Sequence, residues 1–342
     1  MYKRQNLRWG RRQGIAEYLG TVEAERALRM TLIAEVARAY YELIALDNEL
    51  SIVRQTLETR KEGVHQARLR FEGGLTSETS YQQAQVELAT TATLIPELER
   101  RIAVKEHEIA LLAGEYPDRI ARQAMDPAAT MPEHLPVGLP SELLRRRPDV
   151  RRAEQALEAA YAAVGVAYTD RFPRIQLSAA IGVENDLLSS LFSSPYSFVS
   201  GAIAGPVFGF GKKRARYQAQ QAAYRQECRR YERTVLTVFK EVSDAIVTYD
   251  SSLRASELKR NLERAARSYV ELARLQYLNG VINYLDVLDA QRRYFDAQIG
   301  LSNALRDQRL ARVQLYKALG GGWEDAPASP ADSTVPAQSS VK

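Results

Sequence analysis

Two aspartates and an arginine in the last quarter of the chain have the types and spacing for electrostatic chemistry. Asp286 and Asp289 are three positions apart in a helical pattern, so their carboxylates share one helix face, and Arg292 follows three positions later. Such a group can attract or repel ions. It can also serve its own helix, because acids in a first turn complement the helix dipole. The spacing alone favours this helix-cap alternative.

Other chemistry is sparse. The chain has one cysteine, Cys228, and its three histidines, His65, His107 and His134, share no ligand spacing. It contains no Ser/His/Asp set and no complete glycine-rich nucleotide fingerprint. We therefore expect no enzyme, no metal site and no cofactor.

Two glycine-containing turns are predicted. Asp286, Asp289 and Arg292 follow directly after the second turn. The first turn is Gly73-Gly74-Leu75-Thr76-Ser77, and the second spans 278–284. Glycine adopts the left-handed conformation that ends a helix, and Thr76 or Ser77 can cap the helix that follows. Each turn is therefore predicted to join two helical arms.

The arms carry a coiled-coil pattern. Apolar or small residues recur at alternating steps of four and three: Leu32, Val36, Ala39, Leu43, Leu46, Leu50, Val53 and Leu57, and after the turn Ala84, Leu88, Thr91, Ile95, Leu98 and Ile102. This 3.5-residue period predicts helices that supercoil around a neighbour. The first arm should run from about Arg11 to Phe71, roughly 90 Å at 1.5 Å per residue.

The whole hairpin repeats at a constant offset of 206 residues, as in Gly74 and Gly280. Thr31-x3-Glu35-Val36-x2-Ala39 has the same form as the stretch from Thr237 to Ala245, and Ala84-Gln85 recurs as Ala290-Gln291. An internal duplication of this length predicts two like hairpins. The positions that match Asp286 and Asp289 are Ser80 and Gln83, so the acidic pair belongs to the second copy alone.

A period of two replaces the helical period between the copies. Apolar residues alternate with small or polar ones from Ile175 to Val183 and from about Tyr196 to Phe208, which predicts a β-hairpin over about 174–208. Two strands alone are marginally stable in water, so they must pair further. One-sided alternation also suits a transmembrane barrel strand, although the signal per segment is weak. A small soluble β-cap is the alternative.

These elements define a domain plan. Residues 1–114 form the first repeat, 115–148 a proline-rich linker with a short helix at 141–146, and 149–322 the second repeat, which opens with a helix from Asp149 to about Thr169. Residues 323–342 should be disordered. The stretch Leu7–Gly10 is suited to a strand end. No secretory signal opens the chain, so either it is cytoplasmic or its true beginning is missing.

Bulk properties narrow the class further. The chain has 342 residues, 45% hydrophobic content, a formal charge of +5 and a mean hydropathy of -0.34. The cations are spread along the sequence and alternate with glutamate, as on the exposed flanks of coiled coils. A nucleic-acid role would need a concentrated basic patch with a reading element, and the sequence predicts neither.

Three motifs, in this order, resemble one family. They are Leu139–Arg151, then Ala273–Tyr277 with Gly280 and Tyr284–Arg292, and finally Leu315–Trp323. Together with the duplication they resemble the TolC-type outer-membrane factors, the efflux channels of the lipoprotein-type subfamily, from about Leu7 to Trp323.

The resemblance implies a mainly α fold with a small β part. Duplicated coiled-coil hairpins would build an α-barrel in the periplasm, and an antiparallel β-hairpin would contribute to a trimeric outer-membrane β-barrel in lipid. The partners would be two further copies in a homotrimer, a periplasmic adaptor and an inner-membrane pump, with no nucleic acid. The family's signal peptide, lipid-anchor cysteine and first two strands have no counterpart here, so we interpret the chain as N-terminally truncated. Whether it closes a barrel stays open.

The resemblance also assigns roles to residues. The pore constriction would consist of Asp286, Asp289, Arg292, Tyr277 and Leu285. Carboxylate rings at a narrow pore select cations. The tips that contact the adaptor would be Gly74, Leu75, Thr76, Gly280, Val281 and Ile282, and plain turn residues are the alternative there.

The function implied is a passive conduit for small molecules in a tripartite efflux or export system. The competing hypothesis is a soluble coiled-coil scaffold or adaptor with a β-cap. The substrate class, whether drug, metal or peptide, stays open.

Overall fold

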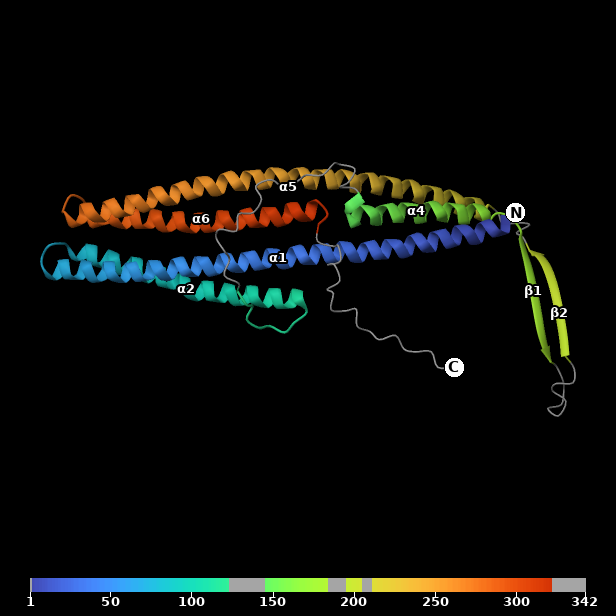
Figure 1. Ribbon diagram of the computed structural model, residues 1–342, viewed down its shortest axis with the longest axis horizontal. Helices are drawn as coiled ribbons and strands as arrows, with labels where there is room; N and C mark the ends of the chain where they lie inside the picture. Colours follow the sequence, from blue (N-terminus) through green and yellow to red (C-terminus); the bar gives the residue numbers. More distant parts are fainter. Residues whose placement is uncertain (1, 123–144, 184–194, 205–210, 322–342) are drawn as a thin grey trace, which may run out of the picture. The chain divides into compact units, whose positions relative to one another are not determined.

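The computed structural model describes residues 2–122, 145–183, 195–204 and 211–321. The described elements are mostly helical, with one small antiparallel sheet, as the fold class predicted (Figure 1). In chain order they are α1 (Tyr2–Glu72), α2 (Glu78–Ala113), α4 (Pro148–Thr169), β1 (Arg174–Val183), β2 (Pro195–Ala204), α5 (Lys212–Leu278) and α6 (Tyr284–Ala318). No helix in the described ranges has a stretch both long and apolar enough to cross a membrane.

Contacts divide the chain into two units. The first consists of Met1–Ala27 with Pro140–Val238, and the second of Leu28–Leu139 with Phe239–Lys342. The first unit contains α4 and the sheet, and the second contains α2, α6 and both glycine turns. The domain limits drawn from the sequence follow the repeat, and they stay a prediction.

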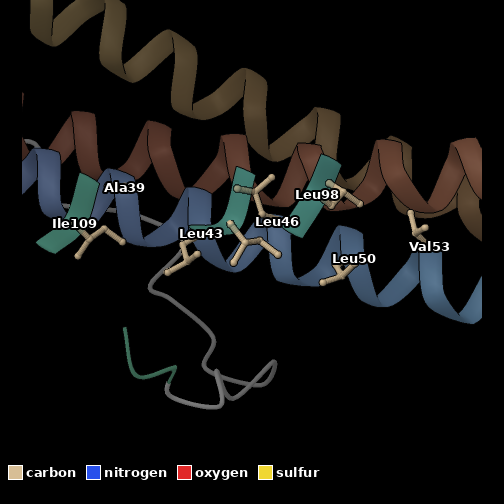
Figure 2. Packing of buried hydrophobic residues seen from close by; sticks show 8 residues of the cluster. Ala39, Leu43, Leu46, Leu50, Val53, Leu98 and Ile109 are labelled. Atoms are coloured by element: carbon tan, nitrogen blue, oxygen red, sulfur yellow. The ribbon is translucent and has the colours of Figure 1, made fainter. Parts of the chain in front are cut away.

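The coiled-coil seam forms the core of the second unit. Leu43 and Val53 on α1 are fully buried, and Leu98 on α2 joins the same cluster. Figure 2 shows the side chains of this cluster along the neighbouring helices. The remaining buried members are Ala39, Leu46, Leu50, Ile102 and Ile109. The buried seam is shorter than the pattern predicted: it begins at Ala39, and Leu32 is exposed.

Charged side chains flank this seam. Lys105 on α2 donates to Glu42 on α1 at 2.9 Å, and Arg38 donates to the same carboxylate at 3.0 Å. Burial raises the pKa of Glu42, but the hydrogen bonds from Lys105 and Arg38 outweigh it, so the net pKa lies below its ordinary value. The seam and its flanks thus bind the two arms of the first hairpin.

The first unit packs α4 against the beginning of α1. Trp9 lies against Gly165, where an added Cβ would come within 2.3 Å of the indole, and its ring is 5.6 Å from that of Tyr161. Asn6 donates to the Thr169 hydroxyl at 2.9 Å. The strand end expected over Leu7–Gly10 is therefore wrong: α1 is already helical from Tyr2, because packing on α4 stabilises these turns.

The two strands form the antiparallel hairpin that the alternation predicted. Leu177 lies opposite Gly201, and Ala179 lies opposite Val199. One face of the sheet carries exposed apolar side chains, since Leu177 and Val199 are each more than 70% exposed, as are Ile181 and Ile203. Both strands are ten residues long.

Some expectations fall outside the described residues. These are most of the linker with its motif residues Leu139–Leu144, the continuation of the second strand to Phe208, and the tail 323–342. Of the short helix expected at 141–146, Arg145 and Arg146 are described and are helical.

Candidate functional site

The two glycine turns have the same backbone geometry. Gly74 and Gly280 have φ angles of 70° and 72°. One residue later, the N–H of Leu75 donates to the Arg70 carbonyl at 2.8 Å, and the N–H of Val281 donates to the Gln276 carbonyl at 2.9 Å. This is the glycine-terminated helix stop, in which the left-handed residue lets a backward hydrogen bond satisfy a free carbonyl.

Each turn presents one aliphatic side chain to solvent. Leu75 is 71% exposed and Val281, its counterpart in the repeat, is 70% exposed. Of the other tip residues, Ile282 is half-buried, and Thr76 has a buried hydroxyl oxygen without a hydrogen-bond partner among the described residues. Single exposed aliphatic residues are common on protein surfaces, so the specific feature here is that the exposure recurs at the same place in both copies.

A small core lies behind the turns. Tyr277 and Tyr284 are both buried, with ring centroids 5.3 Å apart, and the Arg70 guanidinium lies 4.6 Å from the Tyr277 ring centroid. Burial, followed by the nearby Tyr277, raises the pKa of Tyr284. Of the expected constriction residues, Tyr277 thus packs inside the chain, whereas Leu285 is 56% exposed.

The two aspartates have different local partners. Asp286 takes part in a capping box, where its carboxylate accepts from the Asn283 N–H at 3.1 Å, so its helix-cap role is confirmed. Asp289 makes a different contact: it accepts from Arg293 Nε at 2.8 Å, and this hydrogen bond raises the pKa of Arg293. Asp289 and Arg293 remain about half or more exposed, so their charges stay accessible.

Arg292 joins the two hairpins. Its Nε donates at 2.7 Å to Glu87 on α2, and a second guanidinium nitrogen contacts the same oxygen. The other oxygen of Glu87 lies 3.1 Å from Arg60 on α1. The hydrogen bond to Glu87 raises the pKa of Arg292. One carboxylate thus holds cations from α1 and α6.

Arg60 is the unusual member of this group. Its side chain is only 5% exposed, and burial lowers its pKa against the opposing effect of Glu87. Its Nε makes no hydrogen bond to any described residue. A buried cation with one carboxylate partner makes Glu87 structurally important, because loss of that carboxylate would leave a charge uncompensated.

The motifs and periodicity of the sequence predicted no role for Arg60, Glu87 or Arg293. A signal was available in the repeat: Glu87 occupies the position where the second copy has Arg293, so the charge is inverted between copies. Arg60 corresponds to Ala266, where the second copy has no charge. Within the described ranges no three His, Cys, Asp or Glu side chains gather as a metal site.

Comparison with known proteins identifies the family. The family model described as outer membrane efflux protein matches residues 1–115 and 139–321. This chain belongs to the outer membrane efflux protein family. The match covers both repeats and both turns, and family membership favours the channel hypothesis over a soluble scaffold.

Individual relatives agree with this assignment. The chain is 32% identical over 318 residues to outer membrane protein OprJ of Pseudomonas aeruginosa, covering 91% of this chain and 66% of the relative. It is 36% identical to the toluene efflux pump outer membrane protein TtgI of Pseudomonas putida, covering 91% of this chain and 67% of the relative. The chain thus spans about two thirds of the length of these relatives.

A solved structure shows the same fold. The outer-membrane channel OprN superposes with a TM-score of 0.86 and 29% sequence identity, and the alignment covers 93% of this chain and 72% of that one. The recognised family and outer-membrane location are therefore those that the sequence motifs implied.

Proposed function

We propose that this chain forms part of a passive outer-membrane conduit in a tripartite efflux system, as a homotrimer with its helical part in the periplasm. A periplasmic adaptor would bind the hairpin tips, and an inner-membrane pump would supply the energy. Family membership supports this function, and the matched tips are the observation that carries it. Each chain presents two turns of one geometry with an exposed aliphatic residue on each.

The adaptor site would consist of the two turns, with Leu75 and Val281 as the main contacts. Their exposure gives a partner an apolar anchor, and the glycines hold the backbone in one conformation. Leu75→Ser and Val281→Ser together should weaken adaptor binding while leaving the helices intact, since neither side chain is buried. Exposed Leu111 and Val247 changed to serine provide the matched control. Equal weakening by both variants would reject the tip assignment.

The constriction would use Asp286 and Asp289, with Arg292 as a latch between the hairpins. Asp289 keeps its side chain 49% exposed despite its ion pair, so it can face passing ions. Tyr277 would act from within the core by setting the position of the turn, while Leu285 would reach the passage. Opening would separate Arg292 from Glu87 and let the second hairpin move relative to the first.

Single-channel recording tests the constriction. We expect Asp286→Asn with Asp289→Asn to lower cation selectivity, because asparagine keeps the shape and removes the charge. Conductance should rise, because loss of the Asp289–Arg293 ion pair frees the narrow point to open. Glu97→Gln with Glu99→Gln removes the same number of exposed carboxylates from α2 and should leave both quantities unchanged. Unchanged selectivity in the aspartate variant would refute this gate.

A further inference from the structure

One end of the first unit is basic, although the sequence distributes its cations widely. We define the basic collar by three segments: Gln5–Ala16 of α1, Ala159–Arg171 at the end of α4, and Gly211–Gln226 at the start of α5. These segments contain nine Lys and Arg residues and one carboxylate, Asp170. The cations are Arg8, Arg11, Arg12, Arg171, Lys212, Lys213, Arg214, Arg216 and Arg225.

Contacts hold the three segments together. Asn6 on α1 donates to Thr169 at the end of α4. The ring of Tyr168 on α4 lies 5.7 Å from that of Tyr217 on α5. The cations that are far apart in the sequence are therefore neighbours in the fold, and the collar is one charged surface of one unit.

The carboxylates that the structure describes neutralise the collar only in part. Asp170 is 7% exposed, accepts from Asn6 at 3.1 Å and lies 3.8 Å from Arg216. Arg12 pairs with Glu158 at the border of the collar. None of the exposed cations of the first α5 turn forms an ion pair within the described ranges.

The first turn of α5 carries an unfavourable arrangement. Lys212, Lys213 and Arg214 occupy the positive end of the helix dipole, and no acidic residue lies in that turn. Acids are the stabilising choice at a helix N-terminus, and clustered cations there repel one another. Cations at a helix N-terminus, where acidic residues would be stabilising, are typical of a surface that serves binding. Anions from outside the chain would remove the repulsion.

The collar adjoins the apolar sheet. β1 begins at Arg174, three residues after Arg171, and its exposed apolar face starts with Leu177. This end of the collar carries an aromatic group: the Tyr168 ring is 5.6 Å from that of Phe172, and the Arg171 guanidinium is 5.6 Å from the Tyr217 ring centroid. Aromatic rings and cations beside a lipid-compatible apolar surface are the pattern of a membrane–water interface.

We propose that the basic collar binds the headgroup phosphates of anionic phospholipids in the leaflet nearest the helices. Arg171, Lys212, Lys213 and Arg214 make the main contacts. The proposal rests on the proposed function, because it requires the β1–β2 hairpin to lie in the outer membrane. It adds a lipid preference that an apolar hairpin alone would not have.

Vesicle flotation of the purified chain tests the lipid preference. The vesicles are phosphatidylcholine alone or phosphatidylcholine mixed with phosphatidylglycerol. We expect the wild type to bind the anionic vesicles on the order of tenfold more tightly, with the preference shrinking at high salt. The Lys212→Gln, Lys213→Gln, Arg214→Gln variant should lose most of that preference and still bind neutral vesicles.

A second triple variant on the same helix is the matched control. Arg254→Gln, Lys259→Gln and Arg260→Gln remove three exposed cations from α5 outside the collar, so they should leave the preference unchanged. Circular dichroism checks that both variants keep their helix content.

The possible outcomes separate the two proposals. Equal binding of the wild type to both vesicles, or a preference that the collar variant keeps, overturns the collar proposal alone. Equal losses in the collar and control variants also overturn it. If the wild type binds neither vesicle, the outer-membrane function and the collar proposal both fail. A collar variant that alters ion selectivity in neutral bilayers and keeps its lipid preference would place the cations along the passage and refute lipid binding.

Discussion

The two hairpins have the same turns and nearly the same lengths, but their seams differ. In the first, Leu46, Leu50 and Val53 build a hydrophobic cluster with α2. The residues at the same offset in the second are Ser252, Ser256 and Lys259. Ser252 and Ser256 instead donate to carbonyls of their own helix at 2.7 and 2.8 Å. The two copies have therefore kept the same turns and helix lengths, while the side chains at these seam positions have changed from apolar to polar.

The difference indicates that the two hairpins are stabilised in different ways. A leucine seam stabilises the first hairpin through its own two arms, because burial of apolar surface drives that pairing. At these three positions the second copy buries little apolar surface, so this part of the second hairpin depends more on its neighbours. The Glu87 and Arg292 pair is one such neighbour contact, and it exists because the two copies have diverged in charge. A hairpin held in this way is the better candidate for a moving part.

The largest expected effect comes from breaking the charge group. Glu87→Gln should destabilise the chain by about 3–5 kcal/mol, because it leaves Arg60 buried without a charged partner. Arg293→Gln, at the matching position of the second copy, should cost less than ~1 kcal/mol, since that pair is exposed. Urea denaturation followed by circular dichroism measures both. Similar losses in the two variants would contradict the asymmetry.

The seams themselves provide the next test. Leu50→Ala should destabilise by about 3 kcal/mol through lost burial and a residual cavity. Its counterpart Ser256→Ala should change stability by only about 0.5 kcal/mol, because the hydroxyl bonds its own helix. The same urea titration compares them. A small effect at Leu50 would show that the first hairpin does not depend on its seam.

The turns should respond equally. Gly74→Ala and Gly280→Ala each force an L side chain into the left-handed region, at a cost of about 1 kcal/mol. Gly14→Ala is the control with opposite sign: it lies within α1 with nothing within 4 Å of an added Cβ, and it should stabilise by about 0.5–1 kcal/mol. Thermal unfolding measures the three shifts. Unequal costs at the two turns would break their equivalence.

The smallest effect is pH dependence at Glu42. Its folded pKa lies below its ordinary value of 4.5, so the stabilisation it contributes is present above that value and is lost as pH falls through the folded pKa. Glu42→Gln should therefore flatten the acid limb of the stability curve, by less than ~1 kcal/mol given the partial exposure of the pair. Thr248 holds the matching position in the second copy, and Thr248→Val should not alter that limb. An unchanged acid limb in the glutamine variant would exclude Glu42.

Much of the fold was predictable from local rules. The Gly74 and Gly280 stops and the β-hairpin around Leu177 follow from periodicity and glycine conformation, which act over a few residues. The start of α1 was not predictable, because Trp9 is held helical by Gly165, far away in sequence. The site divides in the same way. The helix cap formed by Asp286 was one of the two roles that its spacing allowed, whereas the partners of Arg292 and Arg60 depend on three helices packing together.

The sequence by itself determined the repeat, the turns and the apolar alternation of the strands, because each depends on neighbours within one or two helical turns. Only the tertiary structure decided which charges meet. Cations that look evenly spread in the sequence become a basic collar when α1, α4 and α5 pack side by side, and Glu87 meets both of its arginines by the same kind of packing. The reason is physical: a helix fixes the direction of each side chain locally, but electrostatic energy depends on distances between helices.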